Sequence, residues 1–494
     1  MPDPGTQFHD SSFWLIRLTG RPFVDKSGFI EELLSRPPAR ITRITRPAGF
    51  GKTVNLNMLR DFLDIRMDNS RFFDGLRVLQ NAGLCKKWMH RYPVIWLPLE
   101  LLHEQGPDPV FHSFRRIASD LVIDHSYLLE SPGVDRFHRL RLASICDMLA
   151  SKVRLASTLR YLVRALSDHW GRKVVLLVDD ADKPFACAES EGYRHALTSF
   201  LRELFAGALE ENGLAFAVLA GSLGFDCPER SMFCSHGEEN CGIRDEGFES
   251  CFGFTQAEVA DLLAGAGLAG READLGAWCG GYHVGRESCL HNAREVMFSL
   301  HVLGQQADAE PETGPGADLG TEPCAGIDAA TGTGRSAGPD TGSGTGAGTE
   351  SRAALTPLCH PDWRNRAMRR ALAAALAGRN SREKISDYLE KLLAGGETGF
   401  RFHGLTWKEA AGSRGSLFGA LLHCGWLGQS REPARWGPKE AVYVTVPNGA
   451  ARRELAAMLR EVRAEPAAKG REEALCPAGQ GCKWPDSSPD TSPD

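Results

Sequence analysis

Short apolar runs alternate with longer amphipathic stretches between Phe13 and Leu303. Continuous apolar, β-branched runs are typical of strands buried on both faces, and apolar residues spaced three or four apart predict helices. We expect strands at 40–45, 94–99, 173–179 and 215–221, a shorter one near 250–254, and helices at 54–66, 108–123, 156–170 and 193–210. The alternation predicts an α/β fold in which helices flank a parallel sheet.

The composition changes abruptly after residue 304. The run TGTGRSAGPDTGSGTGAGTES has too few apolar side chains to offset the entropy of ordering it, which predicts a flexible linker. A second compact segment follows, in which an apolar helix at 415–427 precedes a strand at 441–446. This helix-plus-hairpin layout is compatible with a winged helix and equally with a small helical packing module. We expect five parts: a P-loop core at 13–254, a helical lid at 255–304, a disordered linker at 305–355, a small module at 356–463 and a disordered tail at 464–494.

Length and charge narrow the class of protein. The chain has 494 residues, 42% of them hydrophobic, and a formal net charge of −6. These values predict a globular protein of several domains and give no charge-based reason to expect nucleic-acid binding. The first residues lack the basic segment followed by an apolar stretch that is typical of a signal peptide. No apolar run reaches the roughly 18 residues needed to span a membrane. We therefore expect a cytoplasmic protein without a membrane segment, whose 14 cysteines are reduced.

The segment RPAGFGKT, residues 46–53, joins an apolar strand to a helix. Glycines let backbone N–H groups turn toward phosphates, and a helix N-terminus favours an anion. We expect ATP to bind at Gly49, Phe50, Gly51, Lys52 and Thr53, with Lys52 on the β- and γ-phosphates and the Thr53 hydroxyl on Mg²⁺. The full P-loop pattern has glycine where this chain has Arg46. The alternative interpretation is a solvated turn with an ordinary surface lysine.

Two adjacent carboxylates follow the apolar run VVLLV. The carboxyl end of a buried parallel strand is where α/β sheets bind ligands. We expect Asp179 to hold Mg²⁺ and Asp180 to orient or deprotonate the attacking water; the alternative is a strand-to-helix turn capped by aspartate. The next strand ends at Ser222, which either senses the γ-phosphate or starts a turn.

Several segments in order resemble the bacterial AAA-ATPase-like family, whose members often carry a PD-(D/E)XK nuclease-like domain at the C-terminus. The resemblance covers roughly residues 20–300 and includes the arginine at the first-glycine position. It rests on FVDKS at 23–27, RPAGFGKT at 46–53, LLVDDADKP at 176–184, FGFTQAEV at 252–259 and WCGGY at 278–282. It implies a P-loop NTPase fold with a helical lid, ATP and Mg²⁺ as ligands, and mobile-element or defence biology.

The chain departs from the family pattern near the γ-phosphate and the lid. Asp180 replaces a glutamate, Gly280 an aspartate and His283 an arginine, while Gly224 lies near the place of a basic residue. These changes leave nucleotide binding intact and weaken hydrolysis, since losing a general base costs about 10²–10⁴ in rate. One hypothesis is a weak ATPase; the other is a nucleotide-binding switch, or a DNA- or protein-interaction module, that has lost turnover.

Three further sets of residues could form other sites. A nuclease set of Asp and Glu-x-Lys on strands is not found after Asn448, because the acidic residues there lie in a predicted helix. Cysteines and a histidine crowd one loop-like stretch, but their wide spacing favours a cysteine-rich loop over zinc. Arginines nearby are candidates for an arginine finger or for surface salt bridges. These residues are Glu454 and Glu461; Cys227, Cys234, His236, Cys241 and Cys251; and Arg230, Arg244 and Arg286.

Overall fold

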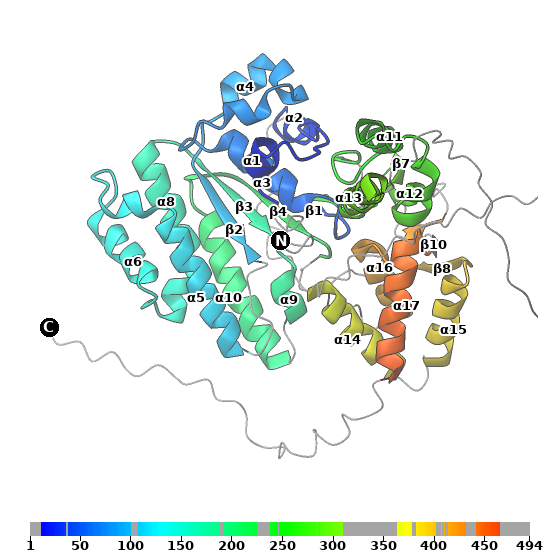
Figure 1. Cartoon of the computed structure of the whole chain (residues 1–494). Helices are drawn as coiled ribbons and strands as arrows, with labels where there is room; N and C mark the ends of the chain where they lie inside the picture. The colour runs from blue at the N-terminus through cyan, green and yellow to red at the C-terminus, as the bar shows by residue number, and fades with distance from the viewer. Residues whose placement is uncertain are drawn as a thin grey trace, which may run out of the picture.

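A computed structural model describes residues 11–309 and 363–464, apart from short gaps at 36–37, 100–106, 188–190, 225–237, 246, 286, 378–381, 402–406, 408–409, 411–412 and 431–440. The described chain forms a parallel sheet with helices on both faces, a small lid of helices and a C-terminal set of helices and strands (Figure 1). This is the α/β architecture that the sequence predicts.

The central sheet has five strands in the order β2-β3-β4-β1-β5, and every neighbouring pair is parallel. The strands are β1 (Ile41–Thr45), β2 (Val94–Pro98), β3 (Val174–Asp179), β4 (Leu214–Gly221) and β5 (Glu238–Cys241). β4 lies between β1, which leads into the glycine-rich loop at 46–53, and β3, which ends in the aspartates. The carboxyl ends of these three strands therefore meet at one edge of the sheet.

Helices cover the sheet on both faces because its central strands are apolar on both sides. Every residue of β3 is buried; Val175 and Leu177 pack into one hydrophobic cluster, and Val174 and Leu176 into another. The first cluster includes α1 (Phe13–Leu18), α2 (Gly28–Leu34), α3 (Lys52–Leu63), α4 (Ala82–Trp88) and the short helices η2 (Ser70–Phe73) and η3 (Arg77–Gln80). The second includes α5 (Pro107–Ile123), η5 (Ser126–Leu129), α6 (Arg136–Cys146), α7 (Lys152–Ala156), α8 (Thr158–Trp170) and α10 (Glu191–Leu209).

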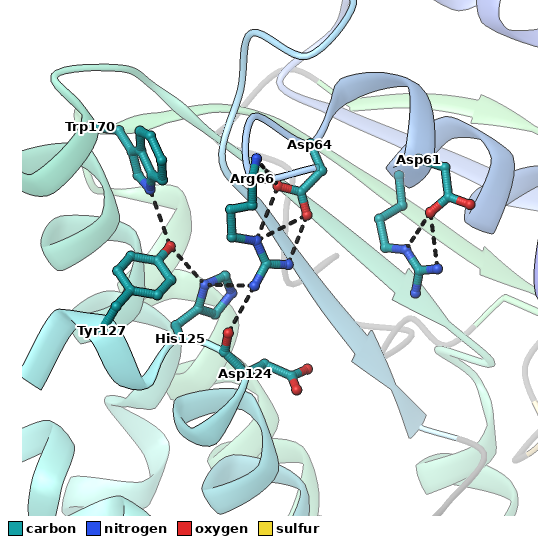
Figure 2. Close-up of polar contacts among 8 residues, drawn as sticks. Asp61, Asp64, Arg66, Asp124, His125, Tyr127 and Trp170 are labelled. Carbon is teal, nitrogen blue, oxygen red and sulfur yellow. Dashed lines mark hydrogen bonds and ion pairs between the residues drawn. The ribbon is translucent and has the colours of Figure 1, made fainter. Parts of the chain in front are cut away.

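A network of polar side chains ties the segment after α3 to the helices of the second face (Figure 2). Arg66 pairs with Asp64 through Nη2 at 2.7 Å and lies 3.4 Å from the His125 ring. His125 contacts the Tyr127 hydroxyl, which accepts a hydrogen bond from the Trp170 indole at 3.1 Å. Burial, and then the charge of Arg66, lower the pKa of His125 to about 3. The ring is therefore neutral near pH 7. The network anchors the chain just after the C-terminal end of α3, the helix whose N-terminal end follows the glycine-rich loop.

The described residues of segment 255–309 form three helices and a hairpin next to the sheet and the C-terminal part (Figure 1). We call them the lid, after the role that the sequence predicts for this segment. Its elements are α11 (Gln256–Gly265), α12 (Glu272–Cys279), β6 (Tyr282–Val284), β7 (Glu287–Leu290) and α13 (Ala293–Ala309). Thr255 and Glu258 form a reciprocal capping box that starts α11. α13 continues through Ala309, into the first residues of the expected linker; the rest of that segment lies outside the described residues, as does the tail after 464.

The C-terminal part is built from four helices around a small antiparallel sheet in the order β8-β10-β9. Its elements are α14 (Trp363–Ala377), α15 (Arg382–Leu393), β8 (Thr398–Arg401), α16 (Arg414–Cys424), β9 (Gly428–Gln429), β10 (Ala441–Thr445) and α17 (Gly449–Ala464). We call this set the C-terminal module. Its apolar residues belong to the same buried cluster as the first face of the sheet. α14 also contacts α9 (Lys183–Cys187), the helix that follows the aspartates.

The predicted fifth strand near 250–254 is wrong. Phe254 makes only an isolated bridge with His291, and the fifth strand is β5 at Glu238–Cys241. β5 has the sequence EENC, and among the described residues its one strand partner is β1, at the edge of the sheet. A polar edge strand carries no apolar run by which a hydrophobic pattern could find it.

Candidate functional site

The glycine-rich loop turns sharply between β1 and α3. Gly49 and Gly51 have φ angles of +79° and +80°, a region that residues with a Cβ seldom adopt. A Cβ at Gly49 would also overlap the carboxamide of Asn292, whereas the space around Gly51 is open. Glycine is thus required at position 49 by both conformation and packing.

Two lid residues, and one residue just before the lid, hold three carbonyls of this loop. The Ala48 carbonyl accepts from Asn292 Nδ2 at 2.9 Å, Gly49 from the Arg294 N–H at 3.0 Å, and Phe50 from the Gly253 N–H at 3.0 Å. In a planar trans peptide the C=O and the following N–H point in opposite directions. With these carbonyls facing the lid, the N–H groups of residues 49, 50 and 51 face the other way. The Phe50 side chain is buried and packs edge-on against Tyr282, so only its backbone is available to a ligand.

Lys52 is buried at the start of α3 and folds back on the loop. Its Nζ donates to the carbonyls of Arg46 at 2.8 Å and Pro47 at 2.9 Å. Burial, and then the charge of Arg364, lower the pKa of Lys52 to about 8, although nearby aspartates oppose the shift. The interpretation of this residue as an ordinary surface lysine is wrong, because its side chain lies inside the protein.

The end of β3 meets the start of α3 through a direct hydrogen bond. The Thr53 hydroxyl donates to Asp179 Oδ2 at 2.7 Å, and Asp179 is fully buried. This hydrogen bond brings together two side-chain oxygens from residues 126 positions apart. Hydroxyl and carboxylate oxygens are the ligand types that Mg²⁺ prefers.

Asp180 has a φ of +49°, an uncommon conformation that aspartate tolerates better than most residues. Its carboxylate forms an ion pair with Arg364 of α14. Arg364 Nε also donates to the Ser222 hydroxyl at 2.9 Å. Asp180 and Ser222 therefore share one partner, which comes from the C-terminal module. Ser222 is fully buried, and its hydroxyl accepts from Arg364 rather than lying in a surface turn.

Asp182 accepts hydrogen bonds from the backbone at the end of β4. Its carboxylate accepts from the N–H groups of Ser222 at 3.2 Å and Leu223 at 3.0 Å, and from the Trp407 indole at 3.1 Å. Burial raises the pKa of Asp182, while the charge of Arg364 opposes the shift. A Cβ at Gly221 would lie 2.6 Å from this carboxylate. Asp182 thus fixes the position of Ser222 and fastens the module to the sheet.

Arg46 points toward the end of β5 and the turn at 247–248. It is fully buried, and its guanidinium donates to the carbonyls of Thr45, Cys241, Gly247 and Phe248 at 2.7–3.2 Å. Burial lowers its pKa to about 10, a value at which it stays charged near pH 7. The arginine at the first-glycine position is therefore a structural crosslink between the loop, β5 and the turn that leads to the lid.

The structure gives a reason for one departure from the family pattern. A Cβ at Gly280 would lie 2.7 Å from the Gly276 carbonyl and 2.9 Å from the His291 ring. The Gly280 carbonyl accepts from Asn448 Nδ2 at 2.8 Å, and the Tyr282 hydroxyl donates to the Gly425 carbonyl at 2.9 Å. The WCGGY segment therefore serves here as a docking surface for the C-terminal module.

The remaining candidates contribute little to this site. Among the described residues no group of three or more His, Cys, Asp or Glu side chains is placed to hold a metal. Cys241 and Cys251 are buried, while Cys227, Cys234 and His236 lie outside the described residues. Arg230 and Arg286 also lie outside them. Arg244 lies near His423 of α16, since its charge helps to lower the pKa of that ring to about 3.

Two hollows lie near these elements. The one bounded by Ala48, Asn292, Arg294, Arg364 and Trp426 measures about 40 Å³, enough for a few waters, whereas small-molecule pockets usually measure about 300–1,000 Å³. The other, about 580 Å³, is lined by residues of α2 and of segment 250–258. Its carboxylates have partners; Glu258, for example, pairs with Lys26 at 2.7 Å. A nucleotide bound next to Arg364 would require the lid or the module to move outward.

Sequence reasoning missed Arg364, Asn292 and Trp407. The structure does bring together Lys52, Thr53, Asp179, Asp180 and Ser222, which the sequence singled out. Arg364 and Trp407 lie in a part of the chain that carries no motif of its own. Arg364 follows Trp363 at the start of α14, and no local feature of that helix marks the arginine as part of a distant site.

Comparisons with known proteins agree with the sheet and the loop. Residues 10–227 match a family model named AAA-ATPase-like and described as a predicted AAA-ATPase. Over 299 residues the chain is 25% identical to a protein of Azotobacter chroococcum mcd 1 described as an uncharacterized protein in the vnfD 5' region; the match covers 59% of this chain and 50% of that protein. The chain thus spans about half the length of this curated relative.

No solved structure matches the chain. Within the described residues, none of the helices has the length and apolar character needed to cross a membrane. The five-stranded parallel sheet and the family match over residues 10–227 together support an AAA-ATPase-like family for this segment of the chain.

Proposed function

We propose that this chain binds MgATP at the glycine-rich loop and hydrolyses it slowly. The observation that carries the proposal is the hydrogen bond of 2.7 Å between the Thr53 hydroxyl and Asp179, next to the buried Lys52. It joins the two strand ends on which phosphate and Mg²⁺ are held in P-loop proteins. The family match over residues 10–227 supports the same proposal.

In the proposed complex the N–H groups of residues 49–51 and the Lys52 ammonium bind the phosphates. Lys52 would exchange the carbonyls of Arg46 and Pro47 for phosphate oxygens, which are stronger acceptors because they are charged. Thr53 and Asp179 would hold Mg²⁺, which neutralises phosphate charge when bound. Residues 13–254, 255–304 and 356–463 would act as core, lid and module of a cytoplasmic protein.

Hydrolysis would use Asp180. The oxygen of a water bonds to the γ-phosphorus, the bond from that phosphorus to the β–γ bridging oxygen breaks, and ADP and phosphate leave. The water's proton passes to the Asp180 carboxylate as the new bond forms. Because Asp180 is already paired with Arg364, it is a poor base until that pair opens.

The same ion pair favours a second candidate function. If the pair between Asp180 and Arg364 persists when ATP is bound, the protein is a nucleotide-dependent switch, acting on a protein or DNA partner without turnover. The two candidates share the binding site and differ only in the fate of the γ-phosphate.

Binding and phosphate release by wild type, Lys52→Ala and Asp180→Glu test both candidates. We expect wild type to bind ATP with Mg²⁺ and to release phosphate slowly, and Lys52→Ala to lose binding by about tenfold or more, since it loses a charge-assisted contact. Lys86→Ala, on an exposed part of α4, is the matched control and should behave as wild type.

The outcomes separate the candidates. Turnover no greater than that of Lys52→Ala, in a wild type that binds ATP, rejects the ATPase and leaves the switch. A gain of turnover in Asp180→Glu would then identify the shortened base as the cause. Absence of ATP binding in wild type rejects both candidates.

A further inference from the structure

Arg364 lies in the first turn of α14, and its guanidinium reaches the end of the central sheet. It is paired with Asp180, 184 positions earlier in the chain, and donates to the Ser222 hydroxyl at 2.9 Å. Only 11% of the Arg364 side chain and 8% of that of Asp180 are exposed. A long cationic side chain of the module is thus buried next to Asp180, the predicted base, and Ser222, the predicted γ-phosphate sensor.

The charges around Arg364 form a compact cluster. Its positive charge is close enough to lower the pKa of Lys52, and close enough to Asp182 to oppose the rise of that pKa. Lys52 and Arg364 are therefore two cations that share a group of buried aspartates. Arginine presents five N–H donors in a planar fork, a geometry that matches phosphate as well as carboxylate.

We propose that Arg364 is a nucleotide-sensing residue, which leaves Asp180 and binds the γ-phosphate when ATP occupies the site. This inference rests on the proposed function. The γ-phosphate offers three charged oxygens in place of the Asp180 carboxylate, and ADP lacks that group altogether. Arg364 therefore distinguishes the triphosphate from the diphosphate.

The exchange also links the nucleotide to the C-terminal module. Arg364 belongs to α14, which contacts α9 directly after the aspartates, and the Trp407 indole donates to Asp182 at 3.1 Å. A change of partner at Arg364 shifts the first turn of α14 relative to the sheet. It also frees Asp180 to accept a proton, so sensing and activation of the base occur in one step.

The test compares the affinities of full-length variants for a hydrolysis-resistant ATP analogue and for ADP, both with Mg²⁺. We expect Arg364→Ala to lose about 10- to 100-fold in affinity for the analogue, the range of a charge-assisted hydrogen bond, and less than about threefold for ADP. Arg364→Lys keeps the charge without the fork and should fall between. Arg370→Ala, on an exposed part of the same helix, is the matched control and should bind as wild type.

A second measurement, on wild type alone, covers the case in which Arg364→Ala fails to fold. The analogue should change the amide hydrogen exchange of the first turns of α14, and ADP should not. An equal loss or an equal gain of affinity for both nucleotides in the Arg364 variants overturns the inference, as does identical exchange of α14 with both.

Failure of the proposed function has a different signature. In that case wild type binds neither nucleotide, or Lys52→Ala binds ATP as tightly as wild type does. If both nucleotides bind in a Lys52-dependent way and Arg364 makes no distinction between them, only the inference about Arg364 is wrong.

Discussion

At the scale of single residues, the burial of the charged Lys52 side chain has a measurable cost in folding free energy. Its ammonium is enclosed by the loop and donates to two carbonyls. Its pKa falls from 10.5 to about 8, mainly because burial penalises the charged form. Between these two values the unfolded chain binds more protons than the folded one, so this group makes stability rise with pH in that window. Below about pH 8 both states are protonated and the cost is constant.

Lys52→Met removes this titration while keeping an unbranched side chain. We compare the free energies of unfolding of wild type and variant. Their difference, wild type minus variant, should rise by about 1.4 kcal/mol per pH unit between pH 8 and 10.5. The lost hydrogen bonds add an offset that does not change with pH. Urea denaturation without nucleotide, at several pH values, measures it. A difference that stays flat from pH 7 to 10 contradicts the lowered pKa.

At the scale of elements, Arg46 fastens β1 to its neighbours. Its guanidinium bonds with Cys241 at the end of β5 and with the turn at 247–248, and it lies 5.5 Å from the centre of the Phe252 ring. β5 has few apolar residues, and an ion pair between Arg43 and Glu238 also helps to hold it. The edge of the sheet next to the glycine-rich loop is thus held by arginines rather than by apolar packing.

Arg46→Ala should lower the free energy of unfolding by about 3–5 kcal/mol, because it leaves a cavity and buried carbonyls without donors. Arg46→Lys should recover only part of this loss, since an ammonium cannot reach all four carbonyls. Chemical denaturation measures both variants. Arg154→Ala, at an exposed residue of α7, is the control, with an expected change within about 0.5 kcal/mol. An equally small change in Arg46→Ala would show that the guanidinium does not fasten the edge.

At the scale of the whole molecule, the module is docked on both the lid and the sheet. Asn448 donates a hydrogen bond to the Gly280 carbonyl of the lid, and the Gly425 carbonyl accepts one from the Tyr282 hydroxyl. Trp407 donates to Asp182 at the end of the sheet. The lid in turn holds two carbonyls of the glycine-rich loop. The module, the lid and the loop therefore form a continuous chain of contacts (Figure 1).

Gly281 offers a direct test of this docking. Its φ is +82°, and an added Cβ would lie 2.7 Å from the Pro447 carbonyl of the module. Gly270 has a φ of +94° with open space around it, so Gly270→Ala carries the backbone cost without the clash. We expect Gly281→Ala to lose about 1–3 kcal/mol more unfolding free energy than Gly270→Ala, the usual range for overpacking. Equal losses in the two variants would mean that the module is not held tightly against the lid.

The sequence by itself determined the features that depend on residues close together in the chain. The buried run of β3 was readable because every side chain of a central strand must be apolar, and the glycine-rich turn because Gly49 and Gly51 need positive φ. Thr53 follows the glycine-rich turn after one parallel strand, and Asp179 ends another. Their approach at one edge of the sheet was therefore also predictable.

Only the tertiary structure decided which distant groups complete the site. Arg364 and Trp407 reach the aspartates across 184 and 225 positions of chain, a proximity that no local pattern encodes. β5 was missed because a polar edge strand is fixed by its pairing with β1 and by ion pairs. The direction of Arg46, toward β5 and the turn at 247–248, follows from carbonyls that become neighbours only when the chain is folded. The local pattern of apolar residues determines which segments form helices and strands. The packing of the folded chain determines which groups the buried charges contact.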